Sequence, residues 1–265
     1  CLNGADISFL CLPDAAARES VSLISNPAAR VIDASTAHRT AEGWVYGLPE
    51  ISAGRRALIA ASKRVANPGC HATGFITLVA PLVKGGIIGS DYPLTAHSVT
   101  GYSGGGKKMI AEYETAGRDI ALDSPRQYSL SLSHKHLPEM VKECDLSHAP
   151  IFNPIVADFY CGMCVTVPLY KNLLLKSLCP DDIREYFAKY YASHNFIKVA
   201  QKDELPAYLA ANELAGTNYL KIYVCGNDDM ILLCSVFDNL GKGASGAAVQ
   251  NMNIMLGLNE TYSLI

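Results

Sequence analysis

The sequence lacks a large excess of charge of either sign and has no long apolar run. Its 265 residues carry 22 Lys and Arg against 25 Asp and Glu, a formal net charge of −3. This balance offers no basic surface for nucleic acid or for an anionic membrane. Apolar stretches such as FITLVAPLV (75–83) are too short to span a bilayer, and no secretory hydrophobic segment opens the chain. The composition, 49% hydrophobic and 18% charged, is typical of a globular protein with one large domain or two ordinary ones.

Cysteines in matched, closely spaced pairs are also missing. The nine cysteines are an odd number scattered over a long sequence, whereas disulfide frameworks occur in short chains with dense, paired cysteines. We therefore expect a protein of the reducing cytoplasm. The chain begins with Cys1. Its first residues, CLNGADISFLCLP, have the pattern of a segment that leads into an internal strand, so we expect that a preceding segment has been removed.

The first part of the sequence alternates strand and helix patterns. Strands are expected at 5–13 and 30–36, with one or two more between 57 and 68, and a helix at 14–24 with Asp14 as its N-cap. Units of this size predict a parallel, doubly wound α/β sheet. After Cys70, apolar residues at helical spacing predict a helix that ends at Gly85-Gly86.

The middle of the sequence is dense in strand patterns, which predicts an α+β region with a mixed or antiparallel sheet. Strands are expected at 93–101, 126–133, 149–159, 164–170, 219–226 and 230–237, and helices at 136–144, 180–194 and 244–258. The last helix could return to the first domain. We predict a dinucleotide-binding domain of residues 1–69 and 240–265, and a catalytic and dimerisation domain of residues 70–239.

The stretch NPGCHATG (67–74) places Cys70 on a bend before a predicted helix. Gly69 permits a tight turn, and the unpaired N–H groups of a helix N-terminus favour a thiolate. The alternative is a buried structural cysteine, since free Cys is among the most buried residue types. His71 would point away on a helix, so a basic partner must come from elsewhere.

The candidate partner lies in SHKHLPEM (133–140). His134 and His136 stand two apart at the end of a predicted strand, before a helix opened by Pro138 and Glu139. Three interpretations stay open: a general acid/base histidine, a metal pair completed by Glu139, and two solvated imidazoles at a strand end.

Two further motifs have weaker functional interpretations. Cys161 and Cys164 have C-x-x-C spacing, which suits zinc or redox exchange, but residues three apart in a strand face opposite sides. SVTGYSGGGKK (98–108) is not a P-loop, because it lacks the G-x-x-x-x-G-K-[ST] pattern. A flexible turn beside an anion and a plain hairpin loop are the two interpretations of its glycines.

Six motifs occur together and in order, and they are spread over nearly the whole chain. They are DASTAHR (33–39), YGLPE (46–50), NPGCHATG (67–74), SVTGYSGGGK (98–107), HKHLPE (134–139) and NLGKGASGAAVQNMN (239–253). This set resembles the N-acetyl-γ-glutamyl-phosphate reductases of arginine biosynthesis, in the shorter of their two sequence types, within the semialdehyde dehydrogenase superfamily.

The resemblance implies a Rossmann-like domain, NADPH as cofactor and a homodimer or homotetramer. It implies that Cys70 is the nucleophile, which forms a thioester as phosphate leaves, and that His134 is the acid/base. His136 is the less favoured acid/base and is assigned, with Arg39, Glu139 and Lys107, to the substrate. Pro13, Ser35, Gly104, Gly105, Asn239 and Gly241 are assigned to the cofactor, and no metal is implied.

One family feature is missing from the sequence. No G-x-x-G-x-x-G turn, which binds the cofactor pyrophosphate, occurs in the 265 residues. We expect a chain that starts at Cys1 to bind NADPH poorly, and the choice of NADP over NAD rests on the resemblance. The rival functions are an aspartate-semialdehyde dehydrogenase-like enzyme, a cysteine hydrolase without nicotinamide, and a metal- or partner-binding module.

Overall fold

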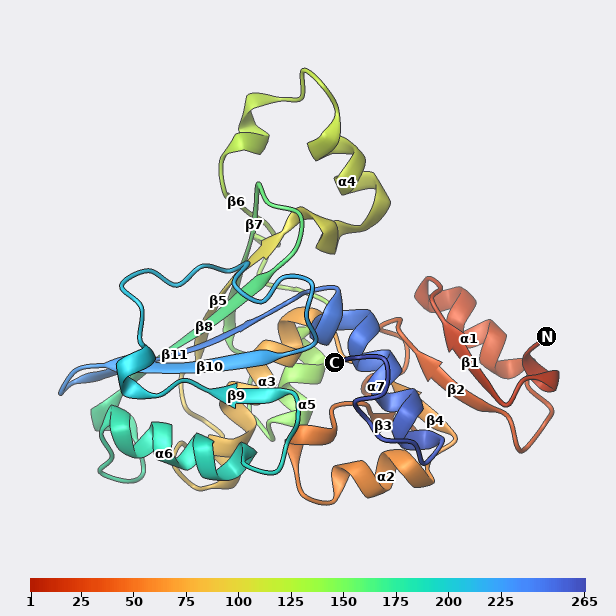
Figure 1. The fold of residues 1–265 in the computed structure, drawn as a ribbon, viewed down its shortest axis with the longest axis horizontal. Coiled ribbons are helices and arrows are strands. Elements are labelled where there is room, and N and C mark those ends of the chain that lie inside the picture. Colours follow the sequence, from red (N-terminus) through yellow and green to blue (C-terminus); the bar gives the residue numbers. More distant parts are fainter.

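The computed structural model describes residues 1–265, which form two sheets with helices packed on them (Figure 1). The first sheet has four parallel strands in the order β1-β2-β4-β3. Their bounds are Ile7–Leu10 (β1), Arg30–Asp33 (β2), Val45–Tyr46 (β3) and Arg64–Ala66 (β4). Parallel strands joined by helical crossovers confirm the α/β prediction for this part of the chain.

Three helices accompany the first sheet: α1 (Asp14–Ser22), α2 (Arg55–Ala61) and α7 (Gly246–Met255). The helix α7 comes from the far end of the chain and packs with α2 over β2 and β4, as Figure 1 shows. Ile32 and Val65 of the strands meet Ile59 of α2 and Ile254 of α7 in this core. The late helix therefore returns to the first sheet, as expected from the sequence.

The second sheet has seven strands in the order β6-β7-β5-β8-β11-β10-β9. The pairs β5-β7 and β9-β10 are parallel and the others are antiparallel, so the sheet is mixed, as predicted. The strands are Thr95–Gly101 (β5), Arg126–Gln127 (β6), Ile151–Ala157 (β7), Met163–Tyr170 (β8), Ile197–Val199 (β9), Leu220–Gly226 (β10) and Met230–Phe237 (β11).

Helices cover one face of the second sheet. These are α3 (Cys70–Lys84), α5 (Leu137–Glu143) and α6 (Pro180–Tyr191), and together with the sheet they enclose a core of 34 buried residues. The central helix α3 is apolar almost all round and buried from His71 to Leu82, which fits a helix packed between other elements. The remaining helix, α4 (Gly106–Glu114), projects with its loops away from both sheets (Figure 1).

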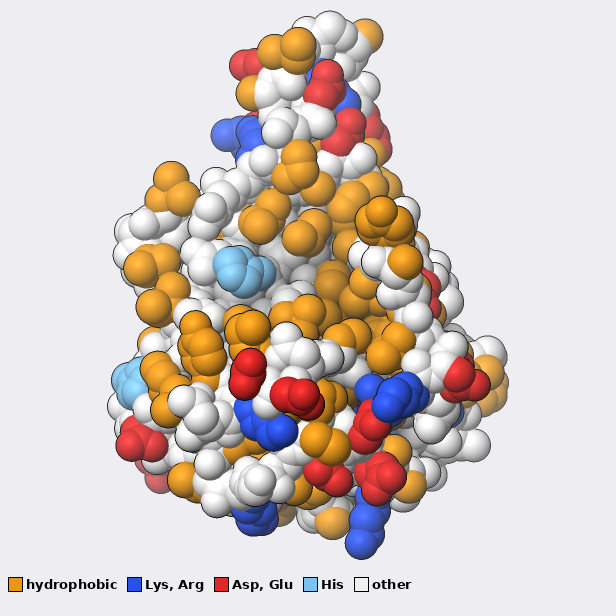
Figure 2. Space-filling model, turned by 90° about the vertical axis from the view of Figure 1, so that its left-hand side faces the viewer, with side chains coloured by type: hydrophobic (Ala, Val, Ile, Leu, Met, Phe, Trp, Pro, Cys, Tyr) orange, Lys and Arg blue, Asp and Glu red, His pale blue; other side chains and the backbone are white.

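The other face of the second sheet leaves large apolar side chains exposed. They alternate along the strands with the buried set and include Ile151, Tyr170, Met230 and Leu232. Figure 2 shows hydrophobic side chains gathered around a hollow on the side of the molecule where the β10–β11 hairpin lies in Figure 1. No helix is long and apolar enough to cross a membrane. All nine cysteines are free thiols.

Three local predictions were wrong. ALIAAS, expected as part of a strand, belongs to α2, because its alanines favour a helix and only Ile59 needs burial. In RQYSLSLS only Arg126–Gln127 is a strand. Ser129 and Leu132 have φ of 54° and 56°, and these left-handed residues end the extended backbone. His134 and His136 therefore lie in a turn and not at a strand end. Asp14 is the first residue of α1 and not its N-cap; its carboxylate accepts bonds from Thr36.

Candidate active site

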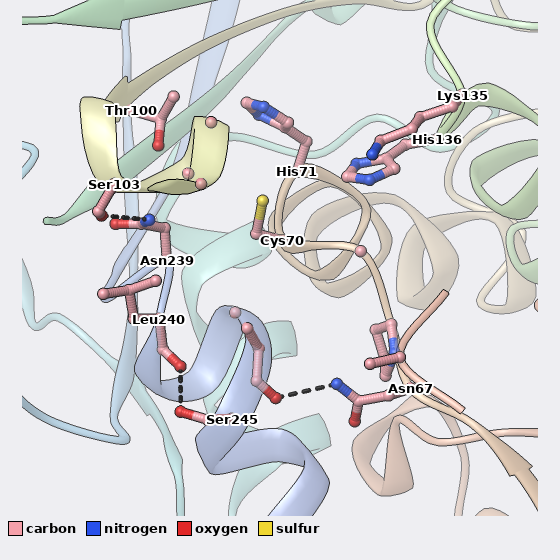
Figure 3. Close-up of a pocket in the computed structure, with 18 of the residues that line it drawn as sticks. Asn67, Cys70, His71, Thr100, Ser103, Lys135, His136, Asn239, Leu240 and Ser245 are labelled. Carbon is pink, nitrogen blue, oxygen red and sulfur yellow. Dashed lines mark hydrogen bonds between the residues drawn. The ribbon is translucent and has the colours of Figure 1, made fainter. Parts of the chain in front are cut away.

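A cavity of about 740 Å³ lies where the two sheets meet. Its wall is built from the start of α3, the glycine turn before α4, the 134–136 turn, and the chain from Asn239 into α7. Figure 3 shows Cys70, His71, Lys135 and His136 from one side of this cavity and Asn239 to Ser245 from the other. The second group forms a π-helical turn, Gly241–Ser245, that leads into α7.

Cys70 is the first residue of α3 and is held between two glycines. The N-cap Gly69 is extended, with φ −75° and ψ 144°, and its carbonyl accepts the first helical bond from Thr73 at 2.8 Å. A Cβ on Gly69 would come within 2.5 Å of Arg39 Nη1 and of His136 Nε2, and a Cβ on Gly243 would lie 3.0 Å from Cys70 Cβ. A side chain at Gly69 would clash with both groups, and one at Gly243 would require its neighbours to shift by a few tenths of an ångström.

Burial raises the pKa of the Cys70 thiol above its ordinary value. The backbone N–H of His71 and the charges of Arg39 and Lys135 act in the opposite direction but do not overcome the burial. The sulfur is therefore a protonated thiol at neutral pH, half-buried at the helix N-terminus. Formation of the thiolate requires a base that takes its proton.

A cluster of three imidazoles lines the same cavity as this thiol. The ring of His71 is 5.4 Å from that of His134 and 5.6 Å from that of His136, and the His134 and His136 rings are 4.7 Å apart. His71 is fixed by Ser98 Oγ at 2.7 Å and by Tyr128 OH at 2.7 Å. Burial lowers the pKa of His71 to about 3 and that of His134 to about 4, and holds the pKa of His136 well below its usual range.

His134 has a defined tautomer. Its Nδ1 accepts the backbone N–H of His136 at 3.1 Å, so the ring proton of the neutral imidazole sits on Nε2. His136 is fully buried, its Nδ1 has no hydrogen-bond partner, and its Nε2 faces Gly69. Both rings are neutral at pH 7. His134 can take a proton on Nδ1 only when that atom releases the His136 N–H, whereas Nδ1 of His136 has no hydrogen-bond partner.

A buried carboxylate fixes the loop that carries Cys70. Glu139 Oε1 pairs with Arg39 Nη1 at 2.7 Å, while Glu139 Oε2 accepts from Tyr46 OH at 2.5 Å and from Gly69 N at 3.1 Å. Arg39 also donates to the carbonyls of Asn67 and Ala34. All the strong hydrogen bonds of this carboxylate are made within the protein, so it acts as a support behind the cavity wall.

Comparison with known proteins matches the whole arrangement. The semialdehyde dehydrogenase dimerisation domain matches residues 70–239, and the semialdehyde dehydrogenase NAD binding domain matches residues 1–59. The N-acetyl-gamma-glutamyl-phosphate reductase 2 of Nostoc sp. is 45% identical over 99% of this chain and 85% of its own length. The N-acetyl-gamma-glutamyl-phosphate reductase of Chelativorans sp. is 47% identical over 96% of this chain and 84% of its own. The chain belongs to the N-acetyl-γ-glutamyl-phosphate reductase family.

Solved structures with the same fold include aspartate semialdehyde dehydrogenases. Aspartate semialdehyde dehydrogenase II from Vibrio cholerae superposes with a TM-score of 0.75 over 97% of this chain and 81% of its own, at 16% identity. The aspartate semialdehyde dehydrogenase of Francisella tularensis gives a TM-score of 0.73 over 96% and 83%, at 15% identity. At such identities the likeness concerns the fold alone. The NAD binding domain match indicates a nicotinamide cofactor for this member of the reductase family.

The structure brings seven of the predicted site residues to the cavity wall and leaves five away from it. On the wall are Cys70, His134, His136, Arg39, Gly104, Gly105 and Asn239. Away from it are Lys107, Glu139, Pro13, Ser35 and Gly241. Lys107 is exposed on α4, Pro13 precedes α1, and Gly241 packs against the Thr217 carbonyl. Ser35 Oγ bonds the Asp33 carboxylate at 2.7 Å.

Several wall residues were missed by sequence reasoning. Lys135 stands between the two histidines, and Asn67 donates to the Ala244 carbonyl at 2.9 Å, which ties the bend before Cys70 to the turn before α7. Asn239 donates to Ser103 Oγ at 3.0 Å and so joins that turn to the glycine loop. Only Lys135 could have been found from the sequence, because it stands inside the motif HKHLPE. The roles of the other residues depend on tertiary contacts.

The metal and redox alternatives find no support in these side chains. No three His, Cys, Asp or Glu side chains converge as metal ligands do, and Glu139 is already bonded to Arg39 and Tyr46. Cys161 and Cys164 are both free, and the Cys164 sulfur lies 3.8 Å from Thr166 Oγ1 on the open face of the second sheet. The C-x-x-C pair thus lies apart from the cavity wall.

The imidazole cluster predicts that the protein loses stability in mild acid. An unfolded histidine takes up a proton near pH 6.5, whereas folded His134 stays neutral to about pH 4 and folded His71 to about pH 3. The contribution of these two histidines to the free energy of unfolding is fully present above the unfolded pKa. It falls by about 1.4 kcal/mol per pH unit for each histidine as the pH drops from the unfolded pKa toward the folded pKa. Urea unfolding between about pH 7 and about pH 5 measures this slope. It should become shallower in His134→Asn, and an unchanged slope in that variant would contradict the prediction.

Replacement of the buried carboxylate should be costly. In Glu139→Gln the Arg39 guanidinium loses its counter-charge in the interior, so we expect a loss of about 3 kcal/mol or more in the free energy of unfolding. The matched control is Asp158→Asn, which breaks a more exposed pair with Arg118 and should lower the free energy of unfolding far less, because solvent screens that pair. Equal losses in the two variants would show that the Glu139 pair is not a stabilising centre.

Proposed function

We propose that the protein reduces N-acetyl-γ-glutamyl phosphate to N-acetylglutamate 5-semialdehyde with NADPH and releases inorganic phosphate. The observation that carries the proposal is the position of Cys70, which faces a large cavity at the N-terminus of α3 beside neutral imidazoles. The relatives that match over nearly the whole chain carry the name of this reductase. The reaction needs a soft nucleophile that forms a thioester. A thiolate meets this requirement, and a serine alkoxide does not.

The first step uses only groups of the chain. His134 takes the thiol proton, and the Cys70 sulfur attacks the acyl carbon. A C–S bond forms, the C–O bond to phosphate breaks with its electron pair going to the phosphate oxygen, and a thioester remains. The N–H groups in the first turn of α3 have no acceptor within the helix and can stabilise the negative charge that develops on the substrate.

The cofactor supplies a hydride that reduces the thioester carbon. The cavity wall toward α7 is built from Leu240, Gly243, Ala244, Ala248 and Val249, and it suits a flat, largely apolar ring because small side chains dominate it. Because Gly243 borders Cys70, a nicotinamide held against this wall would lie near the sulfur. His134 then returns its proton to the substrate oxygen, and collapse of the thiohemiacetal releases the aldehyde and the thiol.

Self-association through the second sheet is part of the proposal. The region 70–239 matches a domain named for dimerisation, and the open face of its sheet exposes Ile151, Tyr170, Met230 and Leu232. Burial of such side chains favours a partner sheet, and a second copy of the chain gives a homodimer or a homotetramer. The cofactor preference for NADPH and the place of the enzyme in the cytoplasm rest on the family resemblance.

A coupled assay tests the reaction. Phosphate-dependent reduction of NADP by N-acetylglutamate semialdehyde should occur with the wild-type protein and disappear in Cys70→Ala, because no thioester forms. Cys161→Ala is the matched control and should keep most of the activity, since Cys161 is away from the cavity wall. Activity retained in Cys70→Ala would end the covalent mechanism. Turnover with aspartate semialdehyde in place of the N-acetylated substrate would assign a different substrate.

The choice between the two histidines is tested with the same assay. His134→Asn should lower kcat by about 100-fold or more, since a positioned acid/base contributes that much. His136→Asn should affect KM more than kcat, because its ring packs against Gly69 and Arg39 on the substrate side. If His136→Asn carries the larger loss in kcat, the acid/base role belongs to His136. The pH profile of kcat/KM in each variant identifies which ring titrates.

A further inference from the structure

The cavity wall contains two cations and no carboxylate. Among its 28 residues, Arg39 and Lys135 are the only Lys or Arg, and neither Asp nor Glu is present. A cavity with this lining attracts anions. The question is which cation is free to bind one.

Arg39 is already committed to the protein. Its Nη1 pairs with Glu139, its Nη2 donates to the Ala34 carbonyl, and its Nε donates to the Asn67 carbonyl. The Glu139 carboxylate compensates its charge at 2.7 Å, and the Arg39 side chain is 8% exposed. Its electrostatic effect on an incoming anion is therefore reduced by a fixed counter-charge.

Lys135, in contrast, has no partner within the protein. It is exposed, no hydrogen bond or ion pair holds its ammonium group, and it stands in the turn between His134 and His136. Figure 3 shows its side chain beside the His136 ring, on the cavity side. Its charge acts on Cys70, His71, His134 and His136, lowering the pKa of each, and it also lowers the pKa of Asp14.

We propose that Lys135 binds the phosphoryl group of the acyl phosphate and stabilises the phosphate as it leaves. The inference rests on the proposed function and names the cation of that same site. As the C–O bond breaks, its electron pair goes to the phosphate oxygen, and the ammonium group compensates the new charge without giving up a proton. A mobile, unpaired lysine suits a group that must be held and then released.

The glycine turn lines the cavity, but Lys107, the lysine that follows it, does not. Lys107 follows Gly106, whose φ of 74° turns the chain away into α4, so Lys107 is not on the cavity wall. Ser103, Gly104 and Gly105 do line the cavity and leave room for the substrate next to Asn239. The sequence places a lysine after three glycines, but the structure brings the lysine of another loop to the anion.

Steady-state kinetics in the direction of phosphate consumption test the proposal. In Lys135→Met the KM for inorganic phosphate should rise by about tenfold or more, since a charge-assisted hydrogen bond is lost, while the KM for NADP changes little. Lys135→Arg keeps the charge and should recover part of the affinity. Lys108→Met, an exposed lysine on α4 away from the wall, is the matched control and should leave the phosphate KM unchanged. An unchanged phosphate KM in Lys135→Met overturns the proposal.

A second measurement does not depend on turnover. Iodoacetamide should alkylate Cys70 of the wild-type protein more slowly when inorganic phosphate is present, and peptide mass spectrometry follows this site among the nine cysteines. The protection should be lost in Lys135→Met and kept in Lys108→Met. If the wild-type protein shows no phosphate-dependent reduction of NADP, the proposed function fails, and the protection experiment still decides whether Lys135 binds phosphate. Equal protection in wild-type and Lys135→Met proteins overturns the assignment.

Discussion

The carboxylate of Glu139 is the contact on which the active site depends. It belongs to α5, yet its partners are Arg39 and Tyr46 from the first sheet and the backbone N–H of Gly69 on the bend before Cys70. One buried group thus joins three distant parts of the sequence at the place where the two sheets meet. Because an unpaired charge is costly in the interior, the pair forms only when all these parts are correctly packed. The position of Cys70 is therefore coupled to the folding of both regions.

The opposite wall of the cavity has its own buried anchor. Lys242, in the turn Gly241–Ser245, is 1% exposed and donates to Glu50 at 2.7 Å and to Gln250 at 2.6 Å. Gln250 also donates to Glu260, which pairs with Arg56. This network ties the turn beside Cys70 to the first sheet and to the end of the chain. Each wall is thus fixed by a buried charged group that does not itself face the cavity, and Asn67 ties the two walls together through the Ala244 carbonyl.

The sequence predicted the parts of the fold whose pattern is local. The helix after Cys70 was correct because its apolar spacing, the glycine before it and the glycines after it all agree. The strand predicted over 126–133 failed because Tyr-Ser-Leu-Ser-Leu-Ser alternates without a neighbouring strand, and Leu130 and Leu132 remain 75% and 51% exposed. Alternation predicts a strand only where a sheet edge is available to pair with it.

The same limit applies to the site. Cys70 and the two histidines were identifiable because reactive residue types stand in short, distinctive motifs. Lys107 was assigned to the substrate and Lys135 was not considered, because a lysine after a glycine run suggests an anion loop. The left-handed φ of Gly106, which precedes Lys107, is invisible in the sequence. Glu139 was assigned to the substrate, whereas its partners come from positions 39, 46 and 69, about 70 to 100 residues away. Contacts at that separation are set by the topology of the two sheets.

The charges of the site explain how a buried thiol is used only when a substrate is present. In the empty cavity, burial raises the pKa of Cys70 and lowers the pKa of His134 to about 4, so transfer of the proton from sulfur to imidazole is unfavourable. A bound acyl phosphate excludes water and adds negative charge, which favours the imidazolium form of His134. The same negative charge would disfavour the thiolate, unless a cation and the N–H groups at the start of α3 compensate it. In the proposed reaction Lys135 is that cation. Its charge also lowers the pKa of His134, so the proton moves from Cys70 to His134 only when the negative charge of the substrate outweighs the charge of the lysine.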